Sequence, residues 1–390
     1  MSHVMNTYSR QPVAFVRGEG VWLWDSGGKR YLDGLAGIAV NTLGHAHPRL
    51  TAALSEQIGK LIHCSNVYQI PAQESLADKL CALSGMDEVF FSNSGCEANE
   101  AAIKLARLYG HKRGIEAPTI IVMEKSFHGR TLATLSATGN RRVQAGFEPL
   151  VKGFVRVPYD DLAAVRHLAT NNRDVVAVLV EPIQGEGGIR TPDASYLQEL
   201  RQICSENNWL MMLDEVQTGI GRTGCWFAHQ HAAIVPDVMT LAKGLGSGVP
   251  IGACLAAGAA TGTFGPGNHG STFGGNPLAC VAGLTTLNVM EQDNLPAYAG
   301  QLGQFIRNGI TAALQGVKGF QEIRGQGLMI GIVLDKPCAE LVKLALARGL
   351  LINVTADSVV RLLPPLVMSQ DEAQQLVDIL CPLIKDFLQS

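Results

Sequence analysis

Several features that would mark other classes of protein are missing from this sequence. No apolar run reaches transmembrane length, and the first residues, MSHVMNTYSRQ, have no apolar core of the kind a signal peptide needs. The nine cysteines are odd in number, and no two are spaced as C-x-x-C. This pattern argues against a disulfide framework and against a zinc ribbon. We therefore expect a cytoplasmic protein in a reducing compartment, with no membrane association.

An excess of charge of one sign is also missing. The chain has 31 Lys and Arg against 34 Asp and Glu, a net charge of −3, and the two signs are mixed throughout. Without a basic run or arm, nucleic acid is not an expected partner. His45 and His47 lie in a Gly/Pro loop without acidic or thiol neighbours, so no metal site is expected.

The composition indicates a large globular protein. The chain has 390 residues, of which 47% are hydrophobic and 17% charged, and this length is enough to bury a sizeable core. Its 43 glycines follow no repeat, which excludes a collagen-like chain and favours tight turns near a ligand.

Short β-branched runs alternate with helical patterns through the middle of the chain. Strands are expected at residues 88–92, 119–123, 175–180, 209–214, 238–241 and 253–256, with helices at 97–109 and 194–207. The run VVAVLV at 175–180 is apolar on both faces, as in a buried parallel strand. The alternation predicts an α/β fold whose sheet is mostly parallel and flanked by helices.

The two ends of the chain show a different pattern. Residues 13–33 combine glycine-rich turns with short strands, and the residues from about Leu284 onward show a long helical stretch, two strand-like runs and a C-terminal amphipathic helix. We expect a large domain at 45–285 and a smaller α+β domain assembled from 1–44 and 286–390.

Polar residues stand at the ends of the predicted strands. These are residues 92–95, 124–130, 181–182, 214–215 and 243–244. In open parallel sheets the ligand binds outside the carboxyl ends of the strands, so these distant segments are expected to meet in one crevice.

Each of these groups also has an ordinary structural interpretation. Asp214 could cap a following helix, or it could pair with a cationic ring nitrogen. Lys243 could be a surface side chain, or a desolvated nucleophile beside the glycines of GLGSGVPIG. The Ser94–Cys96 segment could cap a helix, or it could bind an anion at that helix's N-terminus.

Taken together, nine segments resemble the class-III aminotransferases among the fold-type-I pyridoxal phosphate enzymes, over nearly the whole chain. Within this class they are most similar to the acetylornithine aminotransferases. The segments are WDSGGKRYLD, LGHAHP, SNSGCEANEAAIKLAR, FHGRT, EPIQGEGG, LDEVQTGIGRTG, LAKGLGSGVPIG, STFGGNP and IRGQGLMIG.

The resemblance implies roles for residues around a cofactor, pyridoxal phosphate. Lys243 matches the Schiff-base lysine, and Asp214 matches the partner of the pyridinium nitrogen. The other implied cofactor-binding residues are Ser94, Gly95, Cys96, Phe127, Glu215, Val216, Gln217 and Thr272. Thr272 matches a phosphate ligand donated by a neighbouring subunit, which implies a homodimer with shared active sites. Cys96 departs from the threonine that many relatives carry there.

The resemblance also implies how two substrates, an amino donor and a 2-oxo acid, are bound. Arg130 matches a residue that binds a substrate carboxylate, and Ser271 lies beside the substrate. Glu186 and Arg361 match a switch pair, in which Arg361 binds the 2-oxo acid and Glu186 neutralises it when the ω-amine donor is bound.

The implied reaction is transfer of the ω-amine of N-acetylornithine to 2-oxoglutarate, a step of arginine biosynthesis. Succinylornithine, succinyl-diaminopimelate and ornithine remain alternative donors, and an aminomutase remains an alternative reaction on the same cofactor. A dinucleotide-dependent dehydrogenase is disfavoured because the nearest glycine motif, at residues 325–331, is one residue too long and begins a strand. A DNA-binding regulator is disfavoured because no basic helix-turn-helix segment is present.

Overall fold

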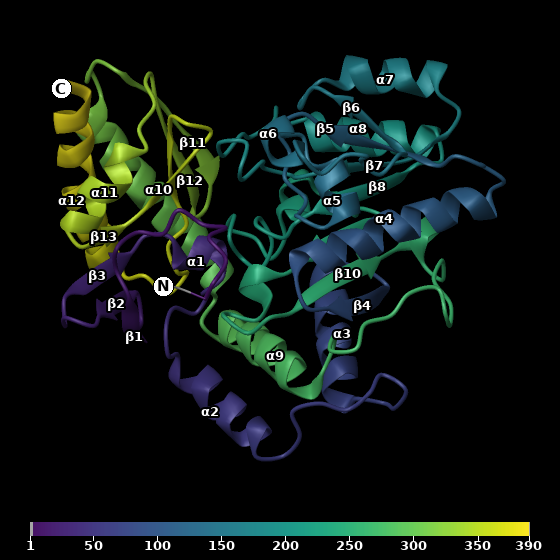
Figure 1. Ribbon diagram of the computed structural model, residues 1–390, viewed down its shortest axis with the longest axis horizontal. Helices are drawn as coiled ribbons and strands as arrows, with labels where there is room; N and C mark the ends of the chain where they lie inside the picture. The colour runs from purple at the N-terminus through teal and green to yellow at the C-terminus, as the bar shows by residue number, and fades with distance from the viewer. Residues whose placement is uncertain (1–2, 390) are drawn as a thin grey trace.

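A computed structural model describes residues 3–389. Figure 1 shows a large lobe built around a central sheet and a smaller lobe that holds the C-terminus. The strands are β1 (Phe15–Glu19), β2 (Trp22–Asp25), β3 (Arg30–Asp33), β4 (Glu88–Ser92), β5 (Thr119–Met123), β6 (Phe154–Val157), β7 (Val175–Val180), β8 (Leu210–Asp214), β9 (Val238–Leu241), β10 (Gly252–Ala256), β11 (Phe320–Gln326), β12 (Met329–Leu334), β13 (Leu350–Leu351), β14 (Asn353–Thr355) and β15 (Val359–Leu362).

The α-helices pack around these strands. They are α1 (Ala36–Ala39), α2 (Pro48–Ile58), α3 (Pro71–Ser84), α4 (Gly95–Lys112), α5 (Leu132–Ala137), α6 (Arg141–Gln144), α7 (Leu162–Asn171), α8 (Tyr196–Glu206), α9 (Pro277–Gln292), α10 (Leu295–Leu314), α11 (Glu340–Ala347) and α12 (Gln370–Gln389). Within residues 3–389, no helix is long and apolar enough to cross a membrane.

The central sheet has seven strands in the order β4-β10-β9-β8-β7-β5-β6. Strands β9, β8, β7, β5 and β6 are mutually parallel, and β10 runs antiparallel to both of its neighbours. The prediction of a mostly parallel α/β sheet is therefore confirmed. The six strands expected in the middle of the chain are all present, with ends that differ by one residue at most.

Helices cover both faces of this sheet because its strands are apolar on both sides. Ile120 and Val122 of β5 pack with the buried alanines and leucine of α4. Ile121 and Met123, the alternate residues of the same strand, pack with Tyr196 and other buried side chains of α8. The period-2 alternation thus fixes which helix lies on which face.

The smaller lobe contains strands from both ends of the chain. One sheet has the order β1-β2-β3-β13, so N-terminal strands pair with a strand near residue 350, and a second sheet has the order β11-β12-β15-β14. The long helical stretch expected after Leu284 is two helices, α9 and α10, because Asn294 adopts φ +49° between them. We propose that residues 45–285 and the two terminal segments are separate domains.

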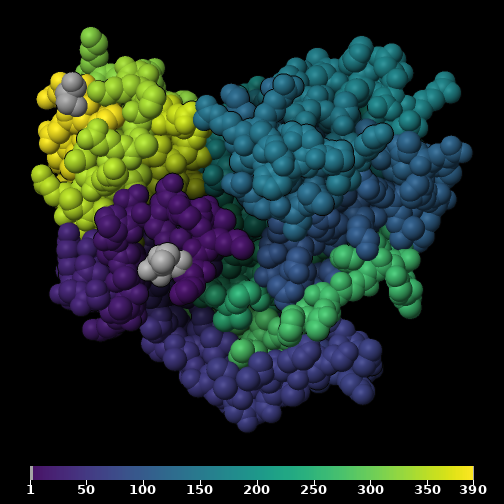
Figure 2. Space-filling model, viewed as in Figure 1, coloured from purple at the N-terminus to yellow at the C-terminus, as the bar shows by residue number. Residues whose placement is uncertain are grey.

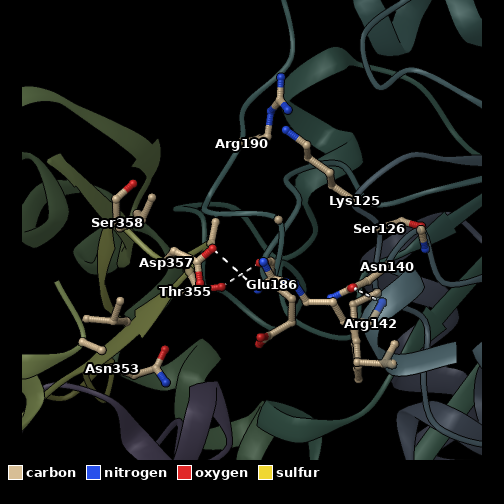
Figure 3. Close-up of a pocket in the computed structure, with 18 of the residues that line it drawn as sticks. Lys125, Ser126, Asn140, Arg142, Glu186, Arg190, Asn353, Thr355, Asp357 and Ser358 are labelled. Carbon is tan, nitrogen blue, oxygen red and sulfur yellow. Dashed lines mark hydrogen bonds and ion pairs between the residues drawn. The ribbon is translucent and has the colours of Figure 1, made fainter. Parts of the chain in front are cut away.

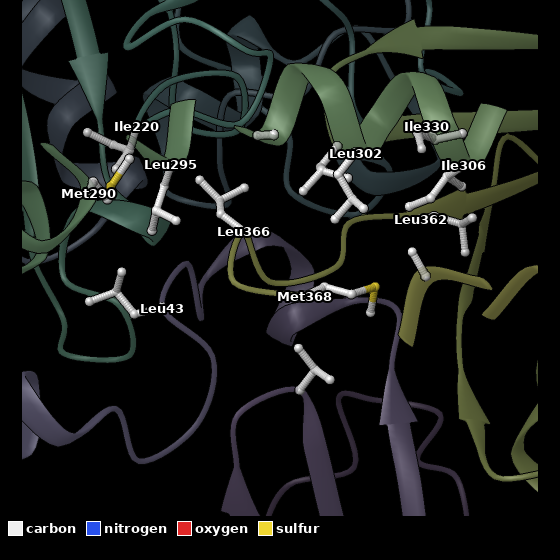
Figure 4. Close-up of a cluster of buried hydrophobic side chains, with 14 of the residues drawn as sticks. Leu43, Ile220, Met290, Leu295, Leu302, Ile306, Ile330, Leu362, Leu366 and Met368 are labelled. Atoms are coloured by element: carbon white, nitrogen blue, oxygen red, sulfur yellow. The ribbon is translucent and has the colours of Figure 1, made fainter. Parts of the chain in front are cut away.

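The two lobes are joined by a continuous apolar core and by one buried arginine. In Figure 4, Leu43, Ile220 and Met290 lie in one cluster with Leu302, Ile330 and Leu362 of the smaller lobe; the members of this cluster are all buried. The buried Arg222 donates hydrogen bonds to the carbonyl oxygens of Leu328 and Pro364. This loop of the large lobe is therefore fixed against the strands β12 and β15 of the smaller one. Figure 2 shows a notch between the yellow-green C-terminal lobe and the teal part of the large lobe.

Candidate active site

The carboxyl ends of the strands meet around one cavity, as their parallel arrangement requires. The cavity has a volume of about 410 Å³, and we call it the cofactor cavity. Its lining includes Asp214 at the end of β8, Lys243 just after β9, Glu181 just after β7, and the residues that follow β4 and β5. The predicted convergence of these distant segments is therefore present in the structure.

Lys243 lies in this cavity on a strained backbone, with φ +43°. Residues other than glycine adopt this left-handed conformation uncommonly. Among the residues described, no carboxylate lies within 4 Å of its amine. Burial, and to a smaller extent the positive charge of Arg361, together lower the pKa of Lys243 to about 8. The amine is therefore far more often unprotonated at neutral pH than an exposed lysine would be.

Asp214 is held in a buried hydrogen-bond network. Its Oδ2 accepts hydrogen bonds from Asn99 Nδ2 and from His128 Nδ1, each at 2.8 Å. Its Oδ1 accepts one from the backbone of Val216 at 3.1 Å. No helix begins at Asp214, so the helix-capping interpretation is wrong. The donors hold the carboxylate in one orientation at the edge of the cavity.

The N-terminus of α4 forms another side of the cavity. Ser94 caps the helix, since its Oγ accepts the hydrogen bond of Glu97 N at 3.2 Å. Gly95 and Cys96 follow it and leave the first N–H groups of an 18-residue helix facing the cavity, which is an anion-binding arrangement. A β-carbon at Gly95 would lie 2.6 Å from Val216 Cγ1, so no larger residue fits beside that wall.

The Cys96 side chain is engaged with the neighbouring loop. Its Sγ accepts the hydrogen bond of Arg130 N at 3.0 Å and lies 3.4 Å from Thr134 Oγ1. A β-carbon at Gly129 would lie 2.4 Å from this sulfur, so glycine permits the contact. The residue at position 96 therefore positions the loop that carries Arg130 and leaves its own backbone N–H for the ligand.

Three further predicted residues complete the cavity wall. Phe127, Val216 and Gln217 all line it. The amide oxygen of Gln217 is buried without a hydrogen-bond partner among the described residues, so this amide is available to a ligand. Arg130 also lines the cavity, and its exposed guanidinium lies 5.7 Å from the centre of the Phe127 ring.

Glu186 and Arg361 form the pair that the resemblance implied, although 175 residues separate them. Arg361 NH1 donates to Glu186 Oε1 at 2.6 Å, and Arg361 Nε donates to Asn353 Oδ1 at 3.0 Å. The Arg361 side chain is 1% exposed and that of Glu186 is 41% exposed. The Thr355 hydroxyl donates to the backbone carbonyl of Glu186 at 2.6 Å and fixes its position.

Four predicted residues do not line this cavity: Arg361, which is connected to it through Glu186, and Glu215, Ser271 and Thr272. The Glu215 carboxylate accepts hydrogen bonds from the backbone of Ala228 and His229, so it holds that segment of the chain. Ser271 and Thr272 line a separate hollow of about 330 Å³. Neither residue is among those that line the cofactor cavity of its own chain.

Sequence reasoning missed Asn99, His128 and Glu181 as individual residues of the site. Glu181 accepts backbone hydrogen bonds from Phe127 at 2.9 Å and from Gly185 at 3.0 Å, and burial raises its pKa. Asn99 was detectable as a polar residue on the buried side of α4. His128 and Glu181 lie in strand-end segments that were expected to meet in the crevice, but the contact of His128 with Asp214, 86 residues away, had no signal in the sequence.

This arrangement is that of a pyridoxal phosphate enzyme, and residues 4–384 match the model of the aminotransferase class-III family. The chain belongs to this family. It is similar to an acetylornithine aminotransferase from Nitrosomonas europaea, with 64% identity over 390 residues that cover 100% of this chain and 99% of that protein. An acetylornithine aminotransferase from Methanothermobacter thermautotrophicus is 45% identical over 98% of this chain and 96% of its own.

Solved structures share the fold over nearly their whole length. The acetylornithine aminotransferase from Elizabethkingia anophelis has a TM-score of 0.88 and 35% identity, covering 99% of this chain and 97% of that one. The ornithine aminotransferase from Toxoplasma gondii has a TM-score of 0.95 and 33% identity, and the match covers 99% of this chain and 93% of that one. The predicted fold-type-I architecture and the aminotransferase class are thereby confirmed.

Pyridoxal phosphate is the cofactor of this family and hence of this enzyme. The cavity fits the molecule in both size and chemistry. Its volume lies within the range of ligand sites. A helix N-terminus is available for a phosphate, a buried carboxylate for a ring nitrogen, and a lysine of lowered pKa for the aldehyde.

The lowered pKa of Lys243 predicts how the apoenzyme captures its cofactor. With a pKa of about 8, about a quarter of the amine is unprotonated at pH 7.5, against roughly a thousandth for an ordinary lysine. We expect the rate of covalent capture of pyridoxal phosphate to rise through pH 7 and to level off above about pH 8. Absorbance measured by stopped flow gives this rate.

Borohydride trapping followed by peptide mass analysis identifies the lysine that reacted. Lys243→Ala should abolish trapping, and Lys318→Ala, which changes an exposed lysine, should leave it intact. A capture rate that still climbs above pH 10 would contradict the lowered pKa.

Proposed function

We propose that this enzyme transfers the ω-amino group of N2-acetyl-L-ornithine to 2-oxoglutarate, giving N-acetylglutamate 5-semialdehyde and glutamate. The observation that carries the proposal is the 64% identity to an acetylornithine aminotransferase over the whole chain. The site geometry supports the reaction class, and the ornithine aminotransferase folds, at 33% identity, make ornithine the main rival donor.

In the proposed mechanism, Lys243 is the group that moves the proton lost by the substrate carbon. Pyridoxal phosphate, when bound, supplies an electron sink for the carbon that loses its proton. The Lys243 amine, once free, would take up that proton on Nζ and later give it back, and its lowered pKa suits it to both transfers. Asp214, whose carboxylate is held in one orientation by Asn99 and His128, would pair with the ring nitrogen and favour its cationic form.

The remaining residues would bind and orient the cofactor and the substrate. Ser94, Gly95 and Cys96 would hold the phosphate at the N-terminus of α4, and Phe127 would pack on the cofactor ring. Gln217, whose buried Oε1 has no hydrogen-bond partner among the described residues, would place its side-chain amide beside the ring oxygen. Arg130, which is exposed and free of carboxylate partners within 4 Å in the described chain, would bind a substrate carboxylate through its planar fork.

A panel of donors tests the proposed substrate. With 2-oxoglutarate as acceptor, kcat/KM should be highest for N-acetylornithine, ahead of succinylornithine, succinyl-diaminopimelate, ornithine and 4-aminobutyrate. A preference for free ornithine or 4-aminobutyrate would overturn the proposal. Reactions without any 2-oxo acid provide the control, since an aminomutase would still turn over in them and an aminotransferase would stop after one half-reaction.

The Glu186–Arg361 pair predicts opposite effects on the two half-reactions. Arg361→Ala removes the cation that would bind the 2-oxo acid, and losing one buried charge partner costs about 3–5 kcal/mol, so kcat/KM for 2-oxoglutarate should fall at least about a hundredfold. Glu186→Gln leaves Arg361 unneutralised, so kcat/KM should fall for the donor and be maintained for 2-oxoglutarate. Steady-state kinetics with each substrate varied separately measures both values. Unchanged activity of Arg361→Ala toward 2-oxoglutarate would refute the switch.

We further propose a homodimer in which each subunit completes its partner's site. Exposed apolar side chains gather near the hollow that holds Ser271 and Thr272: Ile62 is 52% exposed, Val67 79% and Phe273 61%. Asn66 Nδ2 donates to the carbonyl oxygens of Ser271 and Gly274, which ties these segments into one surface. An apolar surface of this kind is typical of a protein interface.

Sedimentation equilibrium should therefore give a mass of twice 41.6 kDa. Ile62→Asp combined with Val67→Asp should shift the mass toward 41.6 kDa and lower the affinity for pyridoxal phosphate, because Thr272 would no longer reach the partner's phosphate site. Val235→Asp, at another exposed apolar residue, is the matched control and should leave the dimer intact. A monomer that binds the cofactor with full affinity would contradict shared sites.

A further inference from the structure

A second and larger cavity adjoins the cofactor cavity. It has a volume of about 1190 Å³, and we call it the basic cleft. Phe127, Arg130 and Glu186 line both cavities, so the two are continuous. One wall comes from α6 and the loops after β5 and β7, and the other comes from strands β14 and β15 of the smaller lobe (Figure 3).

The charges that line this cleft are strongly unbalanced. The cations are Lys125, Arg130, Arg141, Arg142, Arg190 and Arg324, and the only acidic residues in the lining are Glu186 and Asp357. Both carboxylates already have partners, since Glu186 pairs with Arg361 and Asp357 lies 3.7 Å from Arg142. Lys125, Arg141 and Arg190 have no carboxylate within 4 Å in the described part of the chain. The chain as a whole carries a net charge of −3, so this surface differs in sign from the molecule.

The three segments that carry these unpaired cations are fastened to one another. Lys125 N donates to Gly139 O at 3.0 Å, which joins the turn after β5 to the segment that leads into α6. Gln184 Nε2 donates to Glu124 O at 2.8 Å, and Gln184 pairs with Arg190 through two backbone hydrogen bonds. The cations therefore stand on a fixed framework.

Glycine is required where these segments meet. A β-carbon at Gly139 would lie 2.3 Å from Met123 O, and one at Gly187 would lie 2.9 Å from Lys125 O. The backbones approach so closely that side chains are excluded from the contact. Lys125 and Arg190 both line the cleft, and Figure 3 shows their side chains on the same side of it.

We propose that Lys125, Arg141 and Arg190 form a capture site that draws dianionic 2-oxo acids toward the cofactor cavity and favours them over the amino donor. A cleft lined by charge of one sign focuses its field and raises the local concentration of ligands of the opposite sign. 2-Oxoglutarate carries two negative charges, whereas the carboxylate and ammonium of N-acetylornithine cancel. The field therefore attracts the acceptor and exerts little net force on the donor. This inference rests on the proposed function for the identity of the two substrates.

The test is a charge-neutralised variant, Lys125→Gln with Arg141→Gln and Arg190→Gln. The two half-reactions are measured separately by stopped flow: the amino form of the enzyme with 2-oxoglutarate, and the aldehyde form with N-acetylornithine. At low ionic strength we expect the second-order rate constant for 2-oxoglutarate to fall about tenfold, with the value for the donor within about twofold. In the unmodified enzyme, salt should lower the 2-oxoglutarate value, because the Debye length shrinks to about 8 Å at physiological ionic strength. In the variant this dependence should be mostly lost.

The matched control changes the same amount of charge elsewhere. Arg173, Lys318 and Arg348 are exposed cations outside the cleft lining, and their triple Gln variant has the same net charge, −3 minus three, or −6. It should keep both the rate and its salt dependence. Equal losses for both substrates, a loss in the control, or a salt-independent reaction of the unmodified enzyme would each overturn the capture site. A failure of N-acetylornithine as donor would refute the proposed function alone, because the 2-oxoglutarate half-reaction would still test the cleft.

Discussion

Burial removes the water that would solvate the charge of a lysine amine. Where no carboxylate is close enough to compensate, the neutral form is favoured and the pKa falls. Lys243 is in this position, and the rest of the site is consistent with keeping it there. Asp214, at the end of the neighbouring strand β8, accepts hydrogen bonds from Asn99, His128 and the Val216 backbone. Glu186 is occupied by Arg361. Glu181 accepts backbone hydrogen bonds from Phe127 and Gly185. The charges of these three carboxylates raise the pKa of Lys243 by less than burial and Arg361 lower it, so the amine stays reactive.

The parallel sheet makes this arrangement possible. Because β5, β7, β8 and β9 run in the same direction, their carboxyl ends bring residues from distant parts of the chain to one edge. The apolar strands beneath them are buried on both faces, which gives the edge a rigid base. Arg222 and the shared core then fix the smaller lobe against this edge, so that Arg361 of β15 reaches Glu186 of the large lobe.

The sequence allowed good prediction of whatever depends on local pattern. Runs such as VVAVLV identify buried strands, and polar residues at their ends identify the candidate site. Contacts between distant segments were harder to predict from the sequence. His128 could not be matched with Asp214 from spacing, and the Glu186–Arg361 pair was expected only from the resemblance to a family. The basic cleft was also invisible, because Lys125, Arg141 and Arg190 are separated in sequence by ordinary mixed-charge segments.

The exposed fractions of the switch pair decide which partner can move. The Arg361 side chain is 1% exposed and also donates to the half-buried Asn353, so moving its guanidinium would break this hydrogen bond and disturb its buried surroundings. Glu186 is 41% exposed, and its backbone, fixed by Thr355, would stay in place while the carboxylate rotates toward water. Displacing the Glu186 carboxylate therefore costs less free energy than displacing the Arg361 guanidinium. In the proposed exchange, a 2-oxo acid arriving through the basic cleft meets a stationary cation and displaces a mobile anion. The field that attracts the acceptor also stabilises the displaced Glu186, since both are negatively charged and lie against the same lining.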